Sequence, residues 1–279
     1  MFDAAAIILA GGRSSRMGSP KAELDWHGSS LLRRVSGLAK RTVDGPVVVV
    51  RAPDQELPEL DRSVQVVSDA REGRGPLQGL AAGMEAIDER AAVTFVSSTD
   101  APLLHPAFIR RVVGAFTADV DVVLPVLGGF RQPLSAGYRL NLLPKVHALI
   151  DADKLKPAFL FDECEVLRLD ETAMLDDRWL SKGDPDLASV RNLNERSDYE
   201  RALGLPAPAI RVQRFGTLAT GGAPREQEVA AWTLGQVAEA IGLRLEDHIV
   251  AALNGDQITR DPWLPLAAGD TVAFMVAGG

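Results

Sequence analysis

The stretch that decides the fold is Ala4-Ala-Ala-Ile-Ile-Leu-Ala-Gly-Gly-Arg-Ser-Ser-Arg-Met-Gly-Ser-Pro-Lys21. Its apolar run, Ala4 to Leu9, is followed almost at once by Gly11 and Gly12. An apolar run of this length that ends in glycine is typical of a parallel strand buried on both faces. Glycines after such a strand let the backbone approach a ligand closely, with N–H groups free to face an anion.

Positive charge gathers in the same stretch, at Arg13, Arg16 and Lys21. A strand, a glycine turn and cations together suit the phosphates of a nucleoside triphosphate. The alternative is a plain glycine turn with ordinary surface arginines. Open parallel sheets bind ligands beyond the carboxyl ends of their strands, and this favours the nucleotide.

The following residues alternate between strand and helix patterns. Further strands are predicted at Val47 to Val50, Val64 to Val67, Ala92 to Val96, Asp119 to Pro125 and Val166 to Leu169. Helices are predicted after Ser30, which offers a cap, and through Met84, Phe108 and Val146. This rhythm predicts an α/β domain with a doubly wound, mostly parallel sheet over residues 1–205.

Two more segments are expected at the edge of the sheet where the first loop lies. Gly75-Pro-Leu-Gln-Gly79 follows one predicted strand, and Asp100 follows another. Loops after neighbouring strands share one edge, so the two loops can enclose one ligand. A carboxylate there is well placed for Mg²⁺, which takes one or two carboxylates together with phosphates and water. The alternative for Asp100 is a cap on the helix that follows.

Composition narrows the class of protein. The 279 residues suffice for two domains, and the net charge of −8 argues against nucleic-acid and anionic-membrane partners. The single cysteine, Cys164, allows no intrachain disulfide, and the carboxylates beside it should raise its pKa and leave it inert. With no basic leader and no apolar run near the ~20 residues of a membrane span, the sequence predicts a cytoplasmic protein.

The first loop resembles the signature of the molybdenum cofactor guanylyltransferases, within the wider nucleotidyltransferase superfamily. Further family motifs match in order, namely Gly75-Pro-Leu-Gln-Gly79, Asp100 with Pro102, Gln132-Pro-Leu134 and Asn192-Leu-Asn194. The resemblance spans roughly residues 4 to 205. Gly11-Gly12 together with Gly75-Pro76-Leu77 resembles the guanylyl branch, and the related cytidylyl enzymes are the nearest alternative.

The resemblance implies Mg²⁺-dependent transfer of GMP from GTP to molybdopterin, with release of pyrophosphate. It assigns Arg16 and Lys21 to the phosphates and Asp100 to Mg²⁺, and makes these three the catalytic residues. Asp69 and Gly79 would position the guanosine. The whole expected nucleotide site comprises Leu9, Ala10, Gly11, Gly12, Arg13, Lys21, Asp69, Gly75, Pro76, Leu77, Gly79 and Asp100.

The acceptor side is assigned to Gln132, Pro133, Asn192 and Asn194, although turn and capping roles explain the two asparagines as well. The chain departs from the family pattern on this side. Small residues occupy 135–137 where bulkier ones are usual, and 195–196 replace the usual threonine-proline. The acceptor is therefore less firmly indicated than the nucleotide.

A second domain is expected beyond a stiff proline-alanine linker at 206–209. Residues 210–279 predict a small α+β unit, with strands at 210–215, 226–232, 248–253 and 271–276 and one helix after Thr233. The chain then ends in Gly278-Gly279. This end resembles the β-grasp, ubiquitin-like sulfur carriers, namely the small subunit of molybdopterin synthase and the thiamine-pathway carrier.

The resemblance implies that an adenylating, ubiquitin-activating-type enzyme activates Gly279, which then becomes a thiocarboxylate. It also implies the large subunit of molybdopterin synthase as a partner. The thiamine pathway, a module that only docks, and a frayed glycine tail are the alternatives. The choice of the molybdopterin pathway depends on the fusion with a domain of that pathway.

Overall fold

The strand β1 (Ala4–Leu9) lies inside an eight-stranded sheet, between β4 (Val47–Arg51) and β6 (Val93–Ser98). Both pairings are parallel, as the apolar run predicts. Ala4 to Ile8 are wholly buried, because helices cover both faces of the sheet. The computed structural model describes residues 4–11, 20–69, 75–87, 91–219, 224–245 and 248–276.

The strand order of this sheet is β10-β7-β9-β6-β1-β4-β5, with β8 paired to β7. The remaining strands are β5 (Gln65–Ser68), β7 (Val122–Leu127), β8 (Phe130–Arg131), β9 (Ser135–Arg139) and β10 (Val166–Leu169). The β9 strand runs antiparallel between β6 and β7. The sheet is mostly parallel, as predicted, and β8 and β9 are the strands of this sheet that sequence patterns did not reveal. A separate hairpin pairs β2 (Asp25–Trp26) with β3 (Ser29–Ser30).

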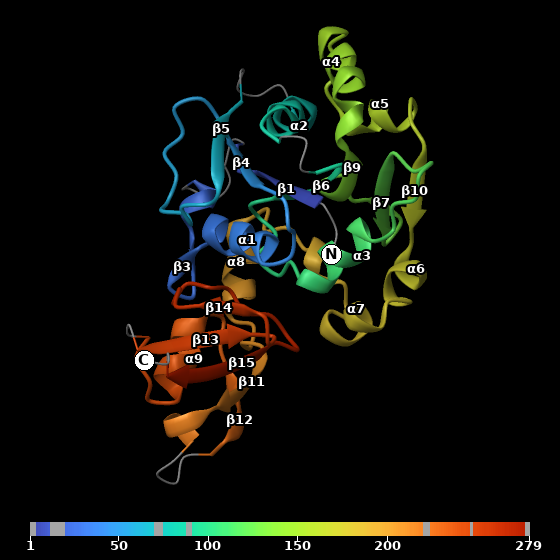
Figure 1. Cartoon of the computed structure of the whole chain (residues 1–279). Helices are drawn as coiled ribbons and strands as arrows, with labels where there is room; N and C mark the ends of the chain where they lie inside the picture. The colour runs from blue at the N-terminus through green and yellow to red at the C-terminus, as the bar shows by residue number, and fades with distance from the viewer. Residues whose placement is uncertain are drawn as a thin grey trace. The chain divides into compact units, whose positions relative to one another are not determined.

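Helices cover both faces of the sheet, which confirms the doubly wound α/β architecture. In Figure 1, α2 (Pro76–Glu85) and α4 (Leu143–Asp151) lie on one side, and α1 (Leu31–Lys40) and α3 (Pro106–Val113) on the other. Ser30 caps α1, as expected, by accepting a hydrogen bond from the Arg33 amide. The other helices up to Leu203 are η1 (Lys21–Glu23), η2 (Leu140–Leu142), α5 (Pro157–Phe161), α6 (Glu171–Leu175), α7 (Arg178–Gly183), η3 (Ala188–Val190) and α8 (Arg196–Leu203).

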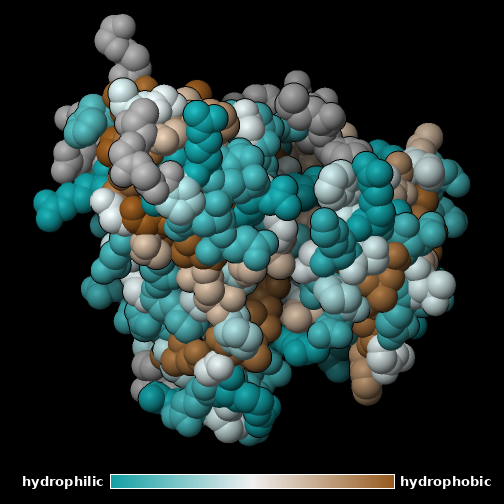
Figure 2. Space-filling model, turned by 90° about the horizontal axis from the view of Figure 1, so that it is seen from below, coloured by the Kyte–Doolittle hydropathy of each residue, from teal (hydrophilic) through white to brown (hydrophobic). Residues whose placement is uncertain are grey.

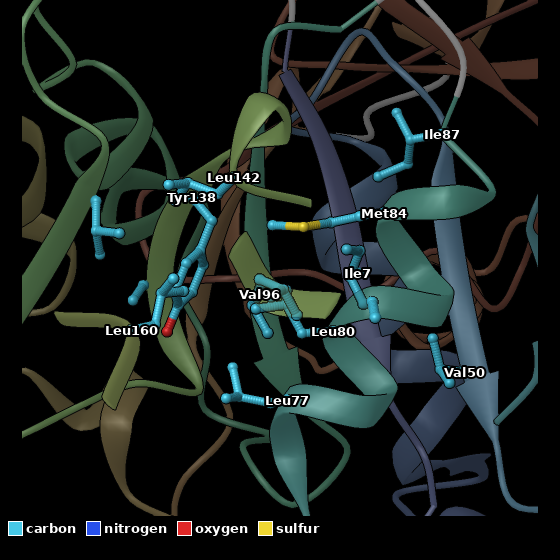
Figure 3. Packing of buried hydrophobic residues seen from close by; sticks show 14 of the residues in the cluster. Ile7, Val50, Leu77, Leu80, Met84, Ile87, Val96, Tyr138, Leu142 and Leu160 are labelled. Atoms are coloured by element: carbon cyan, nitrogen blue, oxygen red, sulfur yellow. The ribbon is translucent and has the colours of Figure 1, made fainter. Parts of the chain in front are cut away.

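The core on the α2 side fixes how closely this helix approaches the sheet. Figure 3 shows Leu80 and Met84 of α2 beside Ile7 and Val96 of the central strands. A Cβ on Gly83 would lie 2.6 Å from Ile7 Cγ2. Glycine at this position therefore lets α2 lie directly on β1.

The chain divides by its contacts into two compact units, Met1–Glu200 and Arg201–Gly279. The second unit has a five-stranded mixed sheet in the order β12-β11-β15-β13-β14. Its elements are β11 (Ala209–Arg214), η4 (Gly216–Ala219), β12 (Glu226–Ala230), α9 (Leu234–Ala240), β13 (Ile249–Leu253), β14 (Gln257–Thr259) and β15 (Thr271–Val276).

The first and last strands of the second unit, β11 and β15, run parallel in the middle of its sheet. Thr233 caps α9 through its hydroxyl, as the sequence predicts. Ala209, assigned above to the linker, is the first residue of β11 and pairs with Ala230. An alanine keeps the backbone N–H that a ladder requires, whereas the prolines before it do not.

Apolar residues on the face drawn in Figure 2 are interspersed among hydrophilic ones. The most exposed large apolar side chains in the described ranges are Phe130 at 74%, Ile258 at 72% and Trp179 at 60%. None of the helices described is long and apolar enough to pass through a bilayer.

Replacing Gly83 by alanine should destabilise the first unit by roughly 1 kcal/mol. Overpacking of a filled core costs about 1–3 kcal/mol, and the better helix propensity of alanine returns about 1 kcal/mol. Urea denaturation of Gly83→Ala and of wild type measures the difference. Gln78→Ala, a half-buried position in the same helix, serves as the control and should shift the midpoint little. An unchanged or higher midpoint for Gly83→Ala would contradict the close packing of α2 on β1.

Candidate functional site

The carboxyl ends of the central parallel strands meet at one edge of the sheet, where the predicted first loop begins. The amides of Ala10 and Gly11 both donate to the Val50 carbonyl on β4, at 2.8 and 3.2 Å. On the other side, the amide and the hydroxyl of Thr99 each donate to the Leu9 carbonyl at 3.2 Å. The start of the loop is thus held by both neighbouring strands.

Lys21 and Asp100, two of the predicted catalytic residues, form an ion pair with 2.6 Å between Nζ and Oδ2. They are 79 residues apart in the chain. Lys21 begins η1, and Asp100 lies two residues beyond the end of β6. The Ser98 hydroxyl donates to the other carboxylate oxygen at 2.5 Å. The side chains of Lys21 and Asp100 remain 22% and 15% exposed, so a ligand in solution can reach them.

The predicted asparagine motif lies next to Asp100 through its middle residue. The Leu193 amide donates to the Asp100 carbonyl at 2.8 Å, and the Leu193 side chain is buried. Asn192 and Asn194, on either side, are exposed. Burial of the leucine therefore fixes the segment that carries both amide side chains beside Asp100.

The second predicted loop leads into α2 beside the end of β1. Gly75 adopts φ +86°, a conformation that favours glycine, and Pro76 opens the helix. A Cβ on Gly79 would lie 3.1 Å from Leu9 Cδ2. Leu77 is wholly buried in the core, so its side chain packs there and only its backbone is available to a ligand.

Asp69 lies at the same edge, after β5, and its amide donates to the Arg51 carbonyl at 2.8 Å. This bond joins the end of β5 to the end of β4, the strand whose Val50 carbonyl binds the amides of Ala10 and Gly11. The expected proximity of the first loop, Asp69 and Asp100 thus follows from the pairing of β5, β4, β1 and β6.

The predicted acceptor side follows the β7–β8 hairpin. The Gln132 amide donates to the Pro125 carbonyl at 2.9 Å, and the Pro133 carbonyl accepts from the Tyr138 hydroxyl at 2.8 Å. Ser135 pairs with Ser97 near the end of β6, which brings Gln132 and Pro133 to the same edge as Asp100.

Packing explains why small residues occupy this strand. A Cβ on Gly137 would lie 2.7 Å from Phe116 Cε2. Ala136 beside it is wholly buried. The departure from the family pattern at 135–137 therefore has a structural reason inside this chain.

Several predicted residues lie outside the described ranges. They are Gly12, Arg13, Arg16, Gly278 and Gly279. Three residues that sequence analysis did not single out take part in the site. Ser98 binds Asp100, and Gln55 and Arg51 contact the backbone beside the first loop. The hydroxyl run Ser97-Ser98-Thr99 was a signal for the first of these, whereas Gln55 lies in a loop without pattern.

No group of three or more His, Cys, Asp or Glu side chains within the described ranges is arranged to hold a metal ion. Among the residues that the structure describes, the Asp100 carboxylate has the Ser98 hydroxyl and the Lys21 ammonium beside it. Such a set does not form an all-protein cage for a cation. It suits a cation that a phosphate ligand also helps to hold.

Residues 6–165 match the family model described as the MobA-like NTP transferase domain, which covers more than half of the chain. The chain belongs to the MobA-like NTP transferase family. All the matched residues lie within the first compact unit. This family membership and the curated relatives agree with the prediction of an enzyme of the nucleotidyltransferase class.

Two curated relatives and one solved structure show the extent of the likeness. A probable molybdenum cofactor guanylyltransferase of Bacillus cytotoxicus is 30% identical over 60% of this chain and 83% of the relative. One from Bacillus cereus is 33% identical over 58% and 81%. Molybdopterin-guanine dinucleotide biosynthesis protein A of Archaeoglobus fulgidus has a TM-score of 0.57 at 20% identity, covering 71% of this chain and 96% of that one, which shows the shared fold.

The single cysteine of this family member is predicted to react slowly. Burial, and then the Asp121 carboxylate, raises the pKa of the Cys164 thiol to about 11. At pH 8 the thiolate is then scarcer than in a free peptide, while each thiolate is a better nucleophile, so alkylation should be about tenfold slower. The alkylation rate should keep rising as the pH is raised through 10.

Mass spectrometry after timed iodoacetamide treatment measures this rate. The urea-unfolded chain is the control, because its thiol has an ordinary pKa and should react at the rate of a cysteine peptide. Alkylation of the folded chain at that same rate at pH 8 would contradict the raised pKa.

Proposed function

We propose that the first unit transfers GMP from GTP to the terminal phosphate of molybdopterin and releases pyrophosphate. The observation that carries the proposal is the Lys21–Asp100 pair at the end of β6, beside the glycine turn that follows β1. The names of the curated relatives support guanylyl transfer. The acidic chain, with its local cations, also suits a phosphate site confined to one edge of the sheet.

Asp100 fits a magnesium ion that arrives with a nucleotide. Mg²⁺ binds through one or two carboxylates together with substrate phosphates and water, and Asp100 supplies one partly exposed carboxylate. When bound there, Mg²⁺ would neutralise charge on the phosphates. The Lys21 ammonium, which contacts Asp100 in the structure, would then turn to a phosphate oxygen as its replacement anion.

The reaction requires no nucleophile from the protein. An oxygen of the acceptor phosphate forms a bond to the α-phosphorus of GTP, and the bond from that phosphorus to the bridging oxygen breaks as pyrophosphate leaves. The protein contributes orientation through Ala10 and Gly11 and positive charge through Lys21. We assign Arg16 and Gly12 to the same phosphates, as the motif implies. Gln132 and the exposed Asn192 and Asn194 are assigned to the acceptor.

A cytidylyltransferase for the same pterin is the second candidate. The Gly75-Pro76 start of α2, with its positive φ at Gly75, favours the guanylyl branch because that dipeptide belongs to the motif of that branch. Turnover of purified protein with molybdopterin and either GTP or CTP separates the two. Faster turnover with CTP than with GTP would identify a cytidylyltransferase and overturn the guanylyl assignment.

Asp100→Asn should lower the Mg²⁺-dependent rate of GMP transfer by about a hundredfold or more while the protein still folds. The amide keeps the shape of the side chain but loses the charge that would hold the cation and counter Lys21. Pyrophosphate release with GTP and molybdopterin measures the rate, and circular dichroism measures folding. Asp44→Asn, at an exposed position, is the control for loss of one acidic charge. Wild-type pyrophosphate release from Asp100→Asn would refute the assignment.

For the second unit we propose a β-grasp sulfur carrier of the molybdopterin synthase type. Its mixed sheet, with β11 and β15 parallel at the centre and α9 packed against one face, supports this proposal. The Gly278-Gly279 segment follows β15 in the sequence. An adenylating enzyme and the large subunit of molybdopterin synthase are the proposed partners, and a module that only docks is the alternative.

Incubation of the 279-residue chain with a cognate activating enzyme, ATP and a sulfur donor should add one sulfur in exchange for one oxygen at Gly279. Two glycines without side chains leave the carboxylate accessible to a narrow active site. Intact-protein mass spectrometry detects the change. A variant extended beyond Gly279 should still bind the synthase subunit but form no thiocarboxylate. Absence of both adenylate and thiocarboxylate on the unmodified chain would end the carrier proposal.

A further inference from the structure

We propose that Gln55 is a positioning residue for nucleotide binding, which holds the peptide group between Ala10 and Gly11 at the start of the first nucleotide loop. The proposal rests on the nucleotide function proposed above. Gln55 lies in the turn that follows β4 (Val47–Arg51). Its Nε2 donates to the Ala10 carbonyl at 3.1 Å, and its Oε1 accepts from the Ala52 amide at 3.0 Å. One side-chain amide thus bridges the backbones of two segments.

The bridge fixes the orientation of the peptide group between Ala10 and Gly11. The carbonyl of Ala10 and the N–H of Gly11 belong to the same peptide unit. The carbonyl accepts from Gln55, and the N–H donates to the Val50 carbonyl on β4. Because the oxygen and the N–H of this peptide group each have a hydrogen-bond partner, the peptide plane cannot rotate without loss of a hydrogen bond.

The peptide group needs this support because the residue that follows it is Gly11. Gly11 has no side chain to limit its backbone, and it is exposed at the edge of the sheet. A Cβ on Gly11 would lie 3.2 Å from the Ala52 nitrogen, so a side chain has little room there. The close approach of the two turns therefore calls for glycine, and Gln55 limits the freedom that glycine brings.

Arg51 extends the same brace toward the second predicted nucleotide segment. Its Nη1 donates to the Gln55 carbonyl at 2.9 Å, and its Nε donates to the Ser68 hydroxyl at 3.1 Å. The Arg51 carbonyl accepts from the Asp69 amide at 2.8 Å. Arg51 and Gln55 together connect Ala10 with the segment that we assign to the guanosine.

Such a brace lowers the cost of binding by holding Ala10 and Gly11 in place before the nucleotide arrives. Neither side chain is needed in the bond-breaking step, so loss of the brace should weaken nucleotide binding more than it slows the reaction. The effect should therefore fall on the KM and Kd for GTP, with kcat within about twofold of wild type.

Gln55→Glu and Gln55→Leu separate the two halves of the bridge. The glutamate keeps an oxygen for the Ala52 amide but loses the donor to Ala10, whereas the leucine loses both. Of the two bonds that leucine removes, only the one to the Ala10 carbonyl reaches the nucleotide loop, and its loss predicts about a fivefold rise in the Kd and KM for GTP. With glutamate, the carboxylate facing that carbonyl predicts a larger rise. Glu56→Ala, at the exposed neighbouring position, should leave both constants unchanged.

Amide hydrogen exchange without nucleotide tests the brace independently of turnover. We expect faster exchange at Gly11 in both variants, and faster exchange at Ala52 with leucine but not with glutamate. If wild type fails to transfer GMP while these exchange changes occur, the proposed function fails and the brace stands.

Unchanged exchange at Gly11, or unchanged GTP binding where wild type binds GTP, overturns the positioning role. Arg51→Met is a second variant should Gln55→Leu fold poorly. It should raise the Kd for GTP less than Gln55→Leu does. In the double variant the two effects should be less than multiplicative, because both residues act through the same turn.

Discussion

The site depends on β1 being hydrogen-bonded in parallel on both sides. Its partners, β4 and β6, are pinned in register from Ala6 and Ala4 respectively to Leu9. Parallel pairing puts the carboxyl ends of all three strands at one edge, and the first glycine turn leaves from the middle of that edge. The short side chains of Ala4 to Ala6 let helices pack on both faces of this strand. A slip against β6 would separate Leu9 from Thr99, and a slip against β4 would remove the Val50 carbonyl from the amides of Ala10 and Gly11.

The approach of α2 is the second constraint on the same edge. Gly79 and Gly83 face Leu9 and Ile7, so the helix lies closer to β1 than larger residues would allow. Gly79 lies against Leu9, the last residue of β1, so the first turns of α2 lie at the carboxyl end of that strand. Helix N-termini present unpaired N–H groups, which suits a segment expected to face an anion. The same two glycines, Gly79 and Gly83, therefore determine both how α2 packs on the core and where its N-terminus lies along the sheet.

Patterns that depend on local chemistry were predictable from sequence. Buried parallel strands such as β1 and β4 leave continuous apolar runs, and Ser30 and Thr233 are helix caps that local spacing reveals. The grouping of Lys21 with Asp100 was expected from strand-end positions, but their direct contact was not. The β9 strand was not predicted because Ser135-Ala-Gly-Tyr-Arg139 has little apolar content. Its position depends on the close packing of Gly137 against the Phe116 ring. Gln55 was missed because its two bonds join segments that only the folded sheet brings together.

The bond from the Leu193 amide to the Asp100 carbonyl has a consequence for how the protein is made. Synthesis proceeds from the N-terminus, so β1, β4 and β6 leave the ribosome long before Leu193 does. The residues that meet at the edge are far apart in the chain, and loop closure of this kind slows folding. A nascent chain that stops short of Leu193 therefore lacks the residue whose amide binds the Asp100 carbonyl. The edge can be completed only when synthesis has passed Leu193, shortly before the helix α8 at the boundary of the two units is made.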